Sequence, residues 1–195
     1  MFMTGKIKAI KQSLLMSQVC LFGFIIICCF LKPHIVFING GVSNFGKYKL
    51  TIGLYLLGFL LDIILIWKAA QQIDKLSHNY YRLVWIFRIL AGLTLIVLIS
   101  TFPRYLSSIY STFHDDLGIL LYSYEFLLSV WLVIKIKTRL SELFLAIETI
   151  GSLIGLFSIL KIIHLLFIGQ FIGAAGFGIL LVVIFPTLFE LELRS

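Results

Sequence analysis

Six continuous apolar runs constrain this chain more than any other feature. They cover about residues 13–31, 50–67, 83–102, 117–134, 143–166 and 172–189, and only short segments separate them. A helix needs about 20 apolar residues to cross the hydrocarbon core of a bilayer. The runs lack the alternation of polar and apolar residues that strands of a membrane β-barrel show. The sequence therefore predicts an all-α, polytopic membrane protein, with six spanning helices in one integral membrane domain over residues 1–195.

Composition supports this class and argues against two others. The chain is 61% hydrophobic and 13% charged, against about 45–50% and about 25% in soluble domains. Its net charge of +7 would favour nucleic-acid binding in a soluble protein. Here the basic residues gather at the ends of the apolar runs, so we expect membrane lipids, and no nucleic acid, as partners. Cys20, Cys28 and Cys29 all fall in the first run, so no disulfide framework is expected.

The distribution of basic residues predicts the orientation in the membrane. One side carries eleven lysines and arginines: Lys6, Lys8, Lys11, Lys68, Lys75, Arg82, Arg88, Lys135, Lys137, Arg139 and Arg194. The other side carries five: Lys32, Lys47, Lys49, Arg104 and Lys161. Because cytoplasmic loops hold the excess of basic residues, we expect both termini in the cytoplasm. The first run is too long for the core of a signal peptide, so it is interpreted as an uncleaved span of a prokaryotic inner-membrane protein.

Two charged residues fall inside predicted spans. Asp62 lies about six residues before the end of the second run, and Arg88 lies about six residues into the third. Charges in the hydrocarbon core each cost at least about 2.5–3.5 kcal/mol on insertion scales, so they need a partner or a role. The similar depth predicts an Asp62–Arg88 ion pair, with a structural role favoured over transport because neither residue reaches the membrane centre.

The fourth run carries one polar stripe in an otherwise apolar helix. Its members follow at spacings of four, four, three and four residues, which places them on one helical face: His114, Gly118, Tyr122, Glu125 and Ser129. Such a stripe faces the bundle interior rather than lipid. Two interpretations stay open, a cavity and direct helix–helix hydrogen bonding.

Potential metal ligands map to the outer side. Histidines stand near the ends of three runs, at His34, His114 and His164, with Asp115 and Asp116 beside the second of them. Imidazoles and carboxylates are the ligands of catalytic zinc, and they also serve as acid–base pairs, for which His114, Asp115, Asp116 and Glu125 are the candidates. No HExxH, P-loop or GxSxG motif is present. A zinc site at His34, His114, His164 and Asp115 is therefore the alternative hypothesis, and no other cofactor is expected.

Two outer segments resemble elements of a known group of proteins. Ser43, Asn44 and Gly46 after the first run resemble an S-[DN]-x-G element, and Phe102-Pro103 followed by His114 resembles an F-P…H element. Both are similar to elements of prokaryotic six-helix membrane proteins of unknown function, near the DRAM-like group. The resemblance implies a six-helix bundle with these residues near one outer site, and it implies no established activity. Asn44 stands where an aspartate is frequent.

These observations lead to two hypotheses of function. The first is a small transporter, a channel-like protein or a lipid-interacting accessory protein. It is based on the stripe of the fourth run, on a similar one in the second run (Thr51, Tyr55, Gly58 and Asp62) and on the lack of a catalytic motif. The polar positions Ser43, Asn44, Tyr122 and Ser129 would then belong to an outer site or an interior stripe. The second is a membrane-embedded metal-dependent hydrolase or transferase with the outer histidine and carboxylate residues as its site. A second copy of the chain, or another membrane protein, is a further expected partner.

Overall fold

The computed structural model describes residues 2–37, 40–76 and 80–192, so His78 and Arg194 lie outside the described residues. These residues form seven α-helices and no strand, which confirms the all-α prediction. The helices are α1 (Phe2–Leu31), α2 (Ile52–Asp74), α3 (Tyr81–Ser100), α4 (Ser108–Ile136), α5 (Arg139–Ile159), α6 (Leu166–Ile179) and α7 (Phe185–Glu192). Short helical turns accompany them: η1 (Pro33–Phe37), η2 (Val42–Lys47), η4 (Pro103–Tyr105) and η5 (Leu180–Ile184).

Six stretches of helix are long and apolar enough to cross a membrane. The first five are those of α1 to α5, and the sixth is the continuous segment Leu166–Phe189, which runs through α6 and η5 into α7. Within η5 the helix widens to π geometry, and the Phe185 amide bonds to the carbonyl of Leu180, five residues back. Pro186 follows immediately and has no amide hydrogen to donate, which disturbs the regular ladder at this point.

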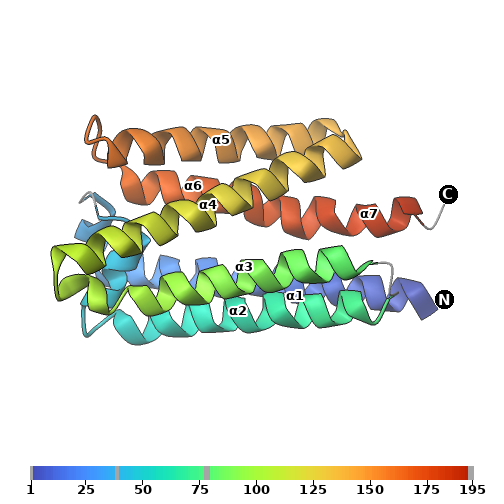
Figure 1. The fold of residues 1–195 in the computed structure, drawn as a ribbon, viewed down its shortest axis with the longest axis horizontal. Helices are drawn as coiled ribbons and strands as arrows, with labels where there is room; N and C mark the ends of the chain where they lie inside the picture. Colours follow the sequence, from blue (N-terminus) through green and yellow to red (C-terminus); the bar gives the residue numbers. More distant parts are fainter. Residues whose placement is uncertain (1, 38–39, 77–79, 193–195) are drawn as a thin grey trace.

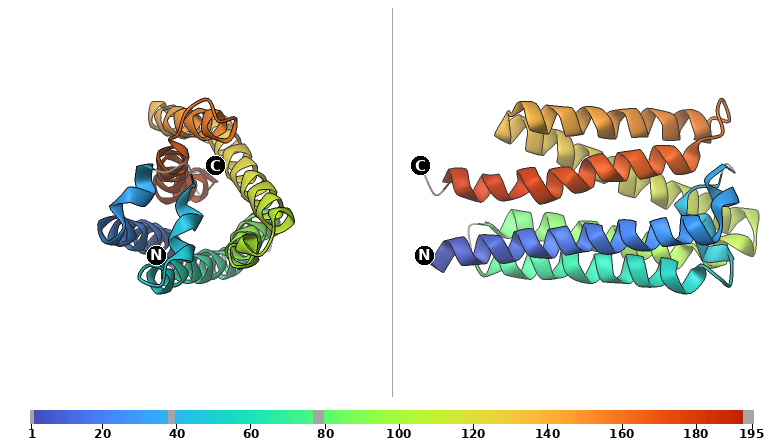
Figure 2. Two further views of the ribbon diagram at one scale, coloured as in Figure 1. Left: turned by 90° about the vertical axis from the view of Figure 1, so that its left-hand side faces the viewer. Right: turned by 180° about the vertical axis from the view of Figure 1, so that it is seen from behind.

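The helices form one bundle with both termini at the same end (Figure 1). Helices α1, α2 and α3 pack side by side, α5 packs along α6, and α4 runs diagonally from the first group to the second (Figures 1 and 2). More than half of the sixth span is buried, a larger share than in any other span. Many large apolar side chains on the outer surface, such as Phe30, Ile99 and Leu127, are exposed, as lipid-facing residues are.

The observed boundaries differ from the predicted ones at three places. Helix α2 continues to Asp74 rather than ending near residue 67, which leaves Asp62 deeper in the bundle than expected. Helix α4 begins at Ser108 and so includes His114, which had been expected before the fourth span. A hydrophobic run marks only the apolar part of a helix. A prediction from hydropathy therefore misses the polar turns at the helix ends.

The third difference is the last turn, which lies between Ile159 and Leu166 rather than at Gly169. Lys161 adopts a left-handed conformation with φ 60°. Its amide bonds to the carbonyl of Ser158, and the Ile162 amide bonds to the carbonyl of Phe157. This is a Schellman ending of α5. His164 therefore lies in a turn beyond α5.

The α5–α6 contact depends on glycines that face each other. A Cβ atom added to Gly151 would lie 2.3 Å from the amide nitrogen of Gly173, and one added to Gly169 would lie 2.5 Å from that of Gly155. Small residues allow such close approach of membrane helices. A Cβ on Gly176 would lie 2.7 Å from the Glu148 amide nitrogen, so α6 also covers the backbone around Glu148.

The two ends of the bundle are filled differently. Toward the termini, three aromatic rings pack in a row with Phe185 in the middle. The ring centroids are 4.7 Å apart for Phe87 and Phe185 and 5.4 Å apart for Phe185 and Phe189. At the opposite end, η2 lies against the bundle: the Val42 amide donates a 2.8 Å hydrogen bond to Oε1 of Gln170. The Thr51 hydroxyl donates to the carbonyl of Phe45 over 2.7 Å. A folded loop thus covers the end of the bundle away from the termini.

Candidate functional site

A cavity of about 150 Å³ lies inside the bundle. Its walls come from α1, η2, α2, α3, α4 and α6, and it reaches from Val42 and Ser43 at the loop end to Asp62 and Ile66 within α2. A cavity of this size holds several waters or one small organic molecule. Four members of the fourth-span stripe, His114, Gly118, Tyr122 and Glu125, line it, and Ser129 is buried. Both interpretations of the stripe are seen in part: its members line this cavity, while His114 and Tyr122 also hydrogen-bond to neighbouring helices, to Ser100 and to the carbonyl of Gly169.

The lining combines acids with aromatic rings. The acids are Asp62 and Glu125, and the aromatic side chains are Phe22, Tyr55, Phe59, Tyr122, Phe171 and Phe177. Further polar groups come from Gln18, Ser43, Thr94, His114 and Gln170. Among the described residues, none of those lining the cavity is a lysine or an arginine. The lining therefore combines carboxyl groups and aromatic rings, without a basic side chain to pair with the carboxyls.

Asp62 is anchored by a neighbouring hydroxyl rather than by a cation. Its side chain is only 3% exposed, and the Ser17 hydroxyl of α1 donates a 2.5 Å hydrogen bond to its Oδ1. The side-chain amide of Gln18 in turn donates to the Ser17 oxygen over 3.1 Å. The carboxylate thus keeps a fixed position on the cavity wall and has an oxygen, Oδ2, left for a ligand.

Arg88, the predicted partner of Asp62, lies elsewhere. Its guanidinium carbon is 5.6 Å from the ring centroids of both Trp67 and Trp85, and its buried Nε has no hydrogen-bond partner. Asp62 is twelve residues from the end of α2 and Arg88 is seven from the start of α3. At a rise of about 1.5 Å per residue, the two lie at roughly 18 and 10 Å from that end of the bundle. The ion pair is absent because the two residues lie at different depths.

Three carboxyl groups gather near the middle of the bundle. Glu125 interacts electrostatically with Asp62 and with Glu148 of α5. Glu125 is eleven residues before the end of α4 and Glu148 is nine after the start of α5, which corresponds to roughly 17 and 14 Å from the same end as Asp62. Along their own helices, the three acids therefore lie at similar distances from the end of the bundle that holds the termini. Sequence reasoning missed Glu148, although one acid in the middle of an apolar run signals a role.

The outer histidines do not come together. His114 is buried on the cavity wall, and its Nδ1 shares a 2.8 Å hydrogen bond with the Ser100 hydroxyl. His34 is exposed, with its ring edge against Tyr48, and His164 is exposed in the turn after α5. In the described part of the chain, no three His, Cys, Asp or Glu residues form a group that could hold a metal ion. The proposed ligand set His34, His114, His164 and Asp115 is therefore not assembled here.

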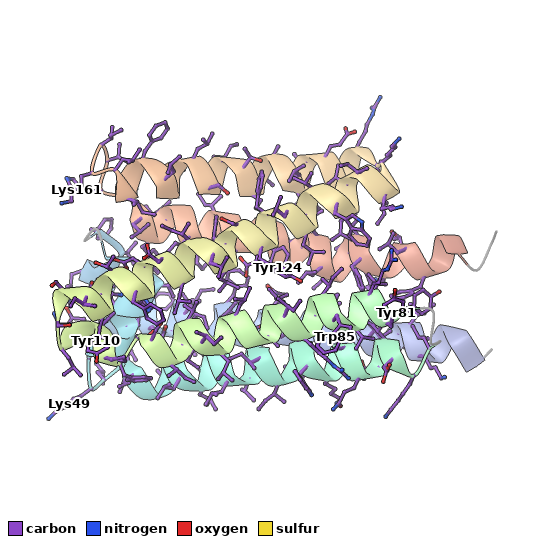
Figure 3. All side chains as sticks on the ribbon, in the orientation of Figure 1. Lys49, Tyr81, Trp85, Tyr110, Tyr124 and Lys161 are labelled. Carbon is purple, nitrogen blue, oxygen red and sulfur yellow. The ribbon has the colours of Figure 1, made fainter. Side chains whose placement is uncertain are left out.

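The remaining predicted outer residues surround the loop end of the cavity. Arg104 hydrogen-bonds to Ser43 and also interacts electrostatically with His114 and Asp115. Asp115 and Asp116 themselves are exposed. The Asn44 amide bonds to the carbonyl of Gly41 over 3.2 Å. Figure 3 marks this end by Lys49, Tyr110 and Lys161, with Tyr81 and Trp85 toward the termini.

Comparisons with protein families, curated proteins and solved structures gave no match to this chain.

Proposed function

We propose that this protein is a membrane transporter for a small, positively charged organic solute. The observation that carries the proposal is the composition of the cavity wall: two carboxyls and six aromatic rings, without a lysine or an arginine among the described residues that line it. An unpaired acid near the bilayer centre marks a substrate or ion pathway. Aromatic faces attract organic cations, and quaternary ammonium groups in particular.

Two further features support transport rather than simple binding. The cavity begins beside η2 at one end of the bundle, whereas the half near the termini is packed with Phe87, Phe185 and Phe189. A solute bound at the acids would thus be closed off by these aromatic rings toward the termini, but not toward η2. The π-helical turn η5 lies just beyond Phe177, a cavity residue, and such turns often mark functional sites in helices.

The setting of this transporter in the cell belongs to the same proposal. The eleven-to-five excess of basic residues supports cytoplasmic termini in a prokaryotic inner membrane, with the loop η2 outside. Lipid headgroups would be its direct partners, and a second copy or another membrane protein would contact its apolar outer surface. The similarity to six-helix membrane proteins near the DRAM-like group stays a prediction and adds no activity.

Uptake of labelled tetramethylammonium into liposomes containing the purified protein tests the proposal. This probe is permanently charged, so it cannot cross the bilayer by losing a proton. We expect uptake above that of protein-free liposomes, and a loss of roughly tenfold or more in D62N and E125Q. Interactions with charged groups contribute about 1.5–3 kcal/mol, which corresponds to such a factor.

Matched controls remove an exposed acid of each type. Asp74 at the end of α2 and Glu142 in the first turn of α5 are exposed, so D74N and E142Q should transport like the wild type. Wild-type uptake no faster than in protein-free liposomes would overturn the proposal. Equal uptake by D62N, E125Q and the controls would show that the cavity acids are not the binding site.

A further inference from the structure

Glu148 is a buried acid that the cavity itself does not use. It lies in the middle of α5, is 1% exposed, and is not among the residues that line the cavity. Its Oε2 atom is buried without a hydrogen-bond partner, and so is the hydroxyl oxygen of Ser129 on α4, which is 0% exposed. Two buried, unsatisfied polar groups from facing helices need an explanation, because each costs free energy in an apolar surrounding.

These two groups belong to one cluster. Ser129 and Glu148 lie close enough to interact, and Glu148 interacts electrostatically with Glu125 and with Tyr122. Glu125 and Tyr122 line the cavity, so Glu148 lies behind the wall that they form. A carboxyl at this position can act electrostatically on the cavity residues Glu125 and Tyr122 without contacting a solute in the cavity.

Every element packed against α5 at this level lacks a positive charge. From α4 the titratable groups are Tyr122 and Glu125, and Asp62 of α2 acts through Glu125. The described residues of α6 and η5 contribute only glycine, one glutamine and apolar side chains. Within the described parts of the chain, no lysine or arginine is among the groups that act on Glu125 or Glu148. The counter-charge available to these acids is therefore a proton or the solute.

We infer that Glu148, with Ser129, forms a proton-binding site that exchanges its proton with Glu125, so that the cavity takes up an organic cation in exchange for a proton. This inference rests on the proposed function. When the solute approaches, the protonated Glu125 gives its proton to the Glu148 carboxylate, and the Glu125 carboxylate formed in this way pairs with the cation. One O–H bond breaks and one forms in this transfer. Glu148 then releases the proton to the side from which the solute came, so one bound cation replaces one proton and the net charge of the site, with its cation, stays at minus one. The Ser129 hydroxyl can donate to the Glu148 carboxylate and can accept from the protonated carboxyl, so the same pair can serve both protonation states.

The test separates solute exchange from proton coupling. Liposomes containing the wild type or E148Q are assayed for tetramethylammonium exchange at equal pH on both sides, and for uptake driven by an acidic interior. A pH-sensitive dye trapped inside records proton efflux. We expect E148Q to keep the exchange but to lose both the acceleration by the pH gradient and the efflux. E142Q, which removes an exposed acid of the same helix, should behave like the wild type in all three measurements.

The possible outcomes distinguish the two proposals. If wild-type liposomes exchange no tetramethylammonium, the proposed function fails and this inference fails with it. If E148Q responds to the pH gradient as the wild type does, the proton site is wrong while the transporter stands. E148D provides a second test if E148Q fails to fold, because aspartate keeps an ionisable carboxyl on a side chain that is one CH₂ group shorter. It should shift the pH at which gradient-driven uptake is half-maximal, and an unchanged pH profile would contradict the inference.

Discussion

Gly151 of α5 lies directly against the backbone of Gly173 of α6, so that a Cβ atom added to Gly151 would be 2.3 Å from the Gly173 nitrogen and 2.7 Å from its Cα. Neither contact can be relieved by rotating a side chain, because both atoms belong to the backbone. We therefore expect G151A to force α5 and α6 apart and to lower the free energy of unfolding by about 1–3 kcal/mol, as overpacked core substitutions do. Thermal unfolding of the purified protein in detergent measures this loss.

Gly155, one turn further along α5, supplies the matched control. A Cβ atom on Gly155 would have no other atom within 4 Å. G155A makes the same chemical change in the same helix without a clash, so its melting temperature should equal or exceed that of the wild type. Equal melting temperatures for G151A and G155A would contradict the close packing of α5 on α6.

The hydrogen bond from Ser17 to Asp62 predicts a second effect on stability. S17A would leave a buried carboxylate oxygen without its donor, which costs about 1–3 kcal/mol. The matched control is S123A, since Ser123 is exposed and its hydroxyl bonds only to the carbonyl of Ile119 in its own helix. We expect the melting temperature to fall in S17A and to change little in S123A. A wild-type melting temperature in S17A would show that Asp62 does not depend on this donor.

The separation of Asp62 from Arg88 is testable by a double-mutant cycle. Residues that share no contact have additive effects within about 0.3–0.5 kcal/mol, whereas a direct pair shows coupling above that range. We expect the stability changes of D62N and R88Q to add in the double variant. A coupling energy of more than about 1 kcal/mol, measured by unfolding in detergent, would restore the ion pair that the sequence had predicted.

The sequence was sufficient to predict the six helices because hydrophobic runs of this length have one stable solution in a bilayer. The basic residues Lys135, Lys137 and Arg139 do mark the α4–α5 junction: Lys135 is in the last turn of α4, Lys137 lies between the helices and Arg139 begins α5. The stripe from His114 to Ser129 was also recognised, because helical periodicity alone puts its members on one face. What faced that stripe could not be predicted, since it depends on how the helices pack.

The errors have a common physical cause. Hydropathy does not detect a polar helical turn, so α2 was ended too early and Asp62 was placed at the depth of Arg88. Glu148 was missed although Ser152 stands four residues after it on the same helical face. Its other polar neighbours, Ser129 and Glu125, come from α4, and the packing of that helix cannot be predicted from the spacing within α5. The outer histidines were predicted to lie together because their helices end on the same side of the membrane. A similar depth in the membrane does not determine how far apart the helices stand within its plane.

The last prediction concerns the orientation of the bundle. Cys20, Cys28 and Cys29 are free and lie in α1, so they are first replaced by alanine or serine. Single cysteines are then introduced at Lys49, beside η2, and at Arg139, at the end of the bundle near the termini; both positions are exposed. A membrane-impermeant thiol reagent added to intact cells should label K49C at once and R139C only after the membrane is permeabilised, because basic residues are retained on the cytoplasmic side. Immediate labelling of R139C but not of K49C would reverse the orientation. Labelling of both from outside would break the six-span topology, and with it the depth at which Asp62, Glu125 and Glu148 are placed.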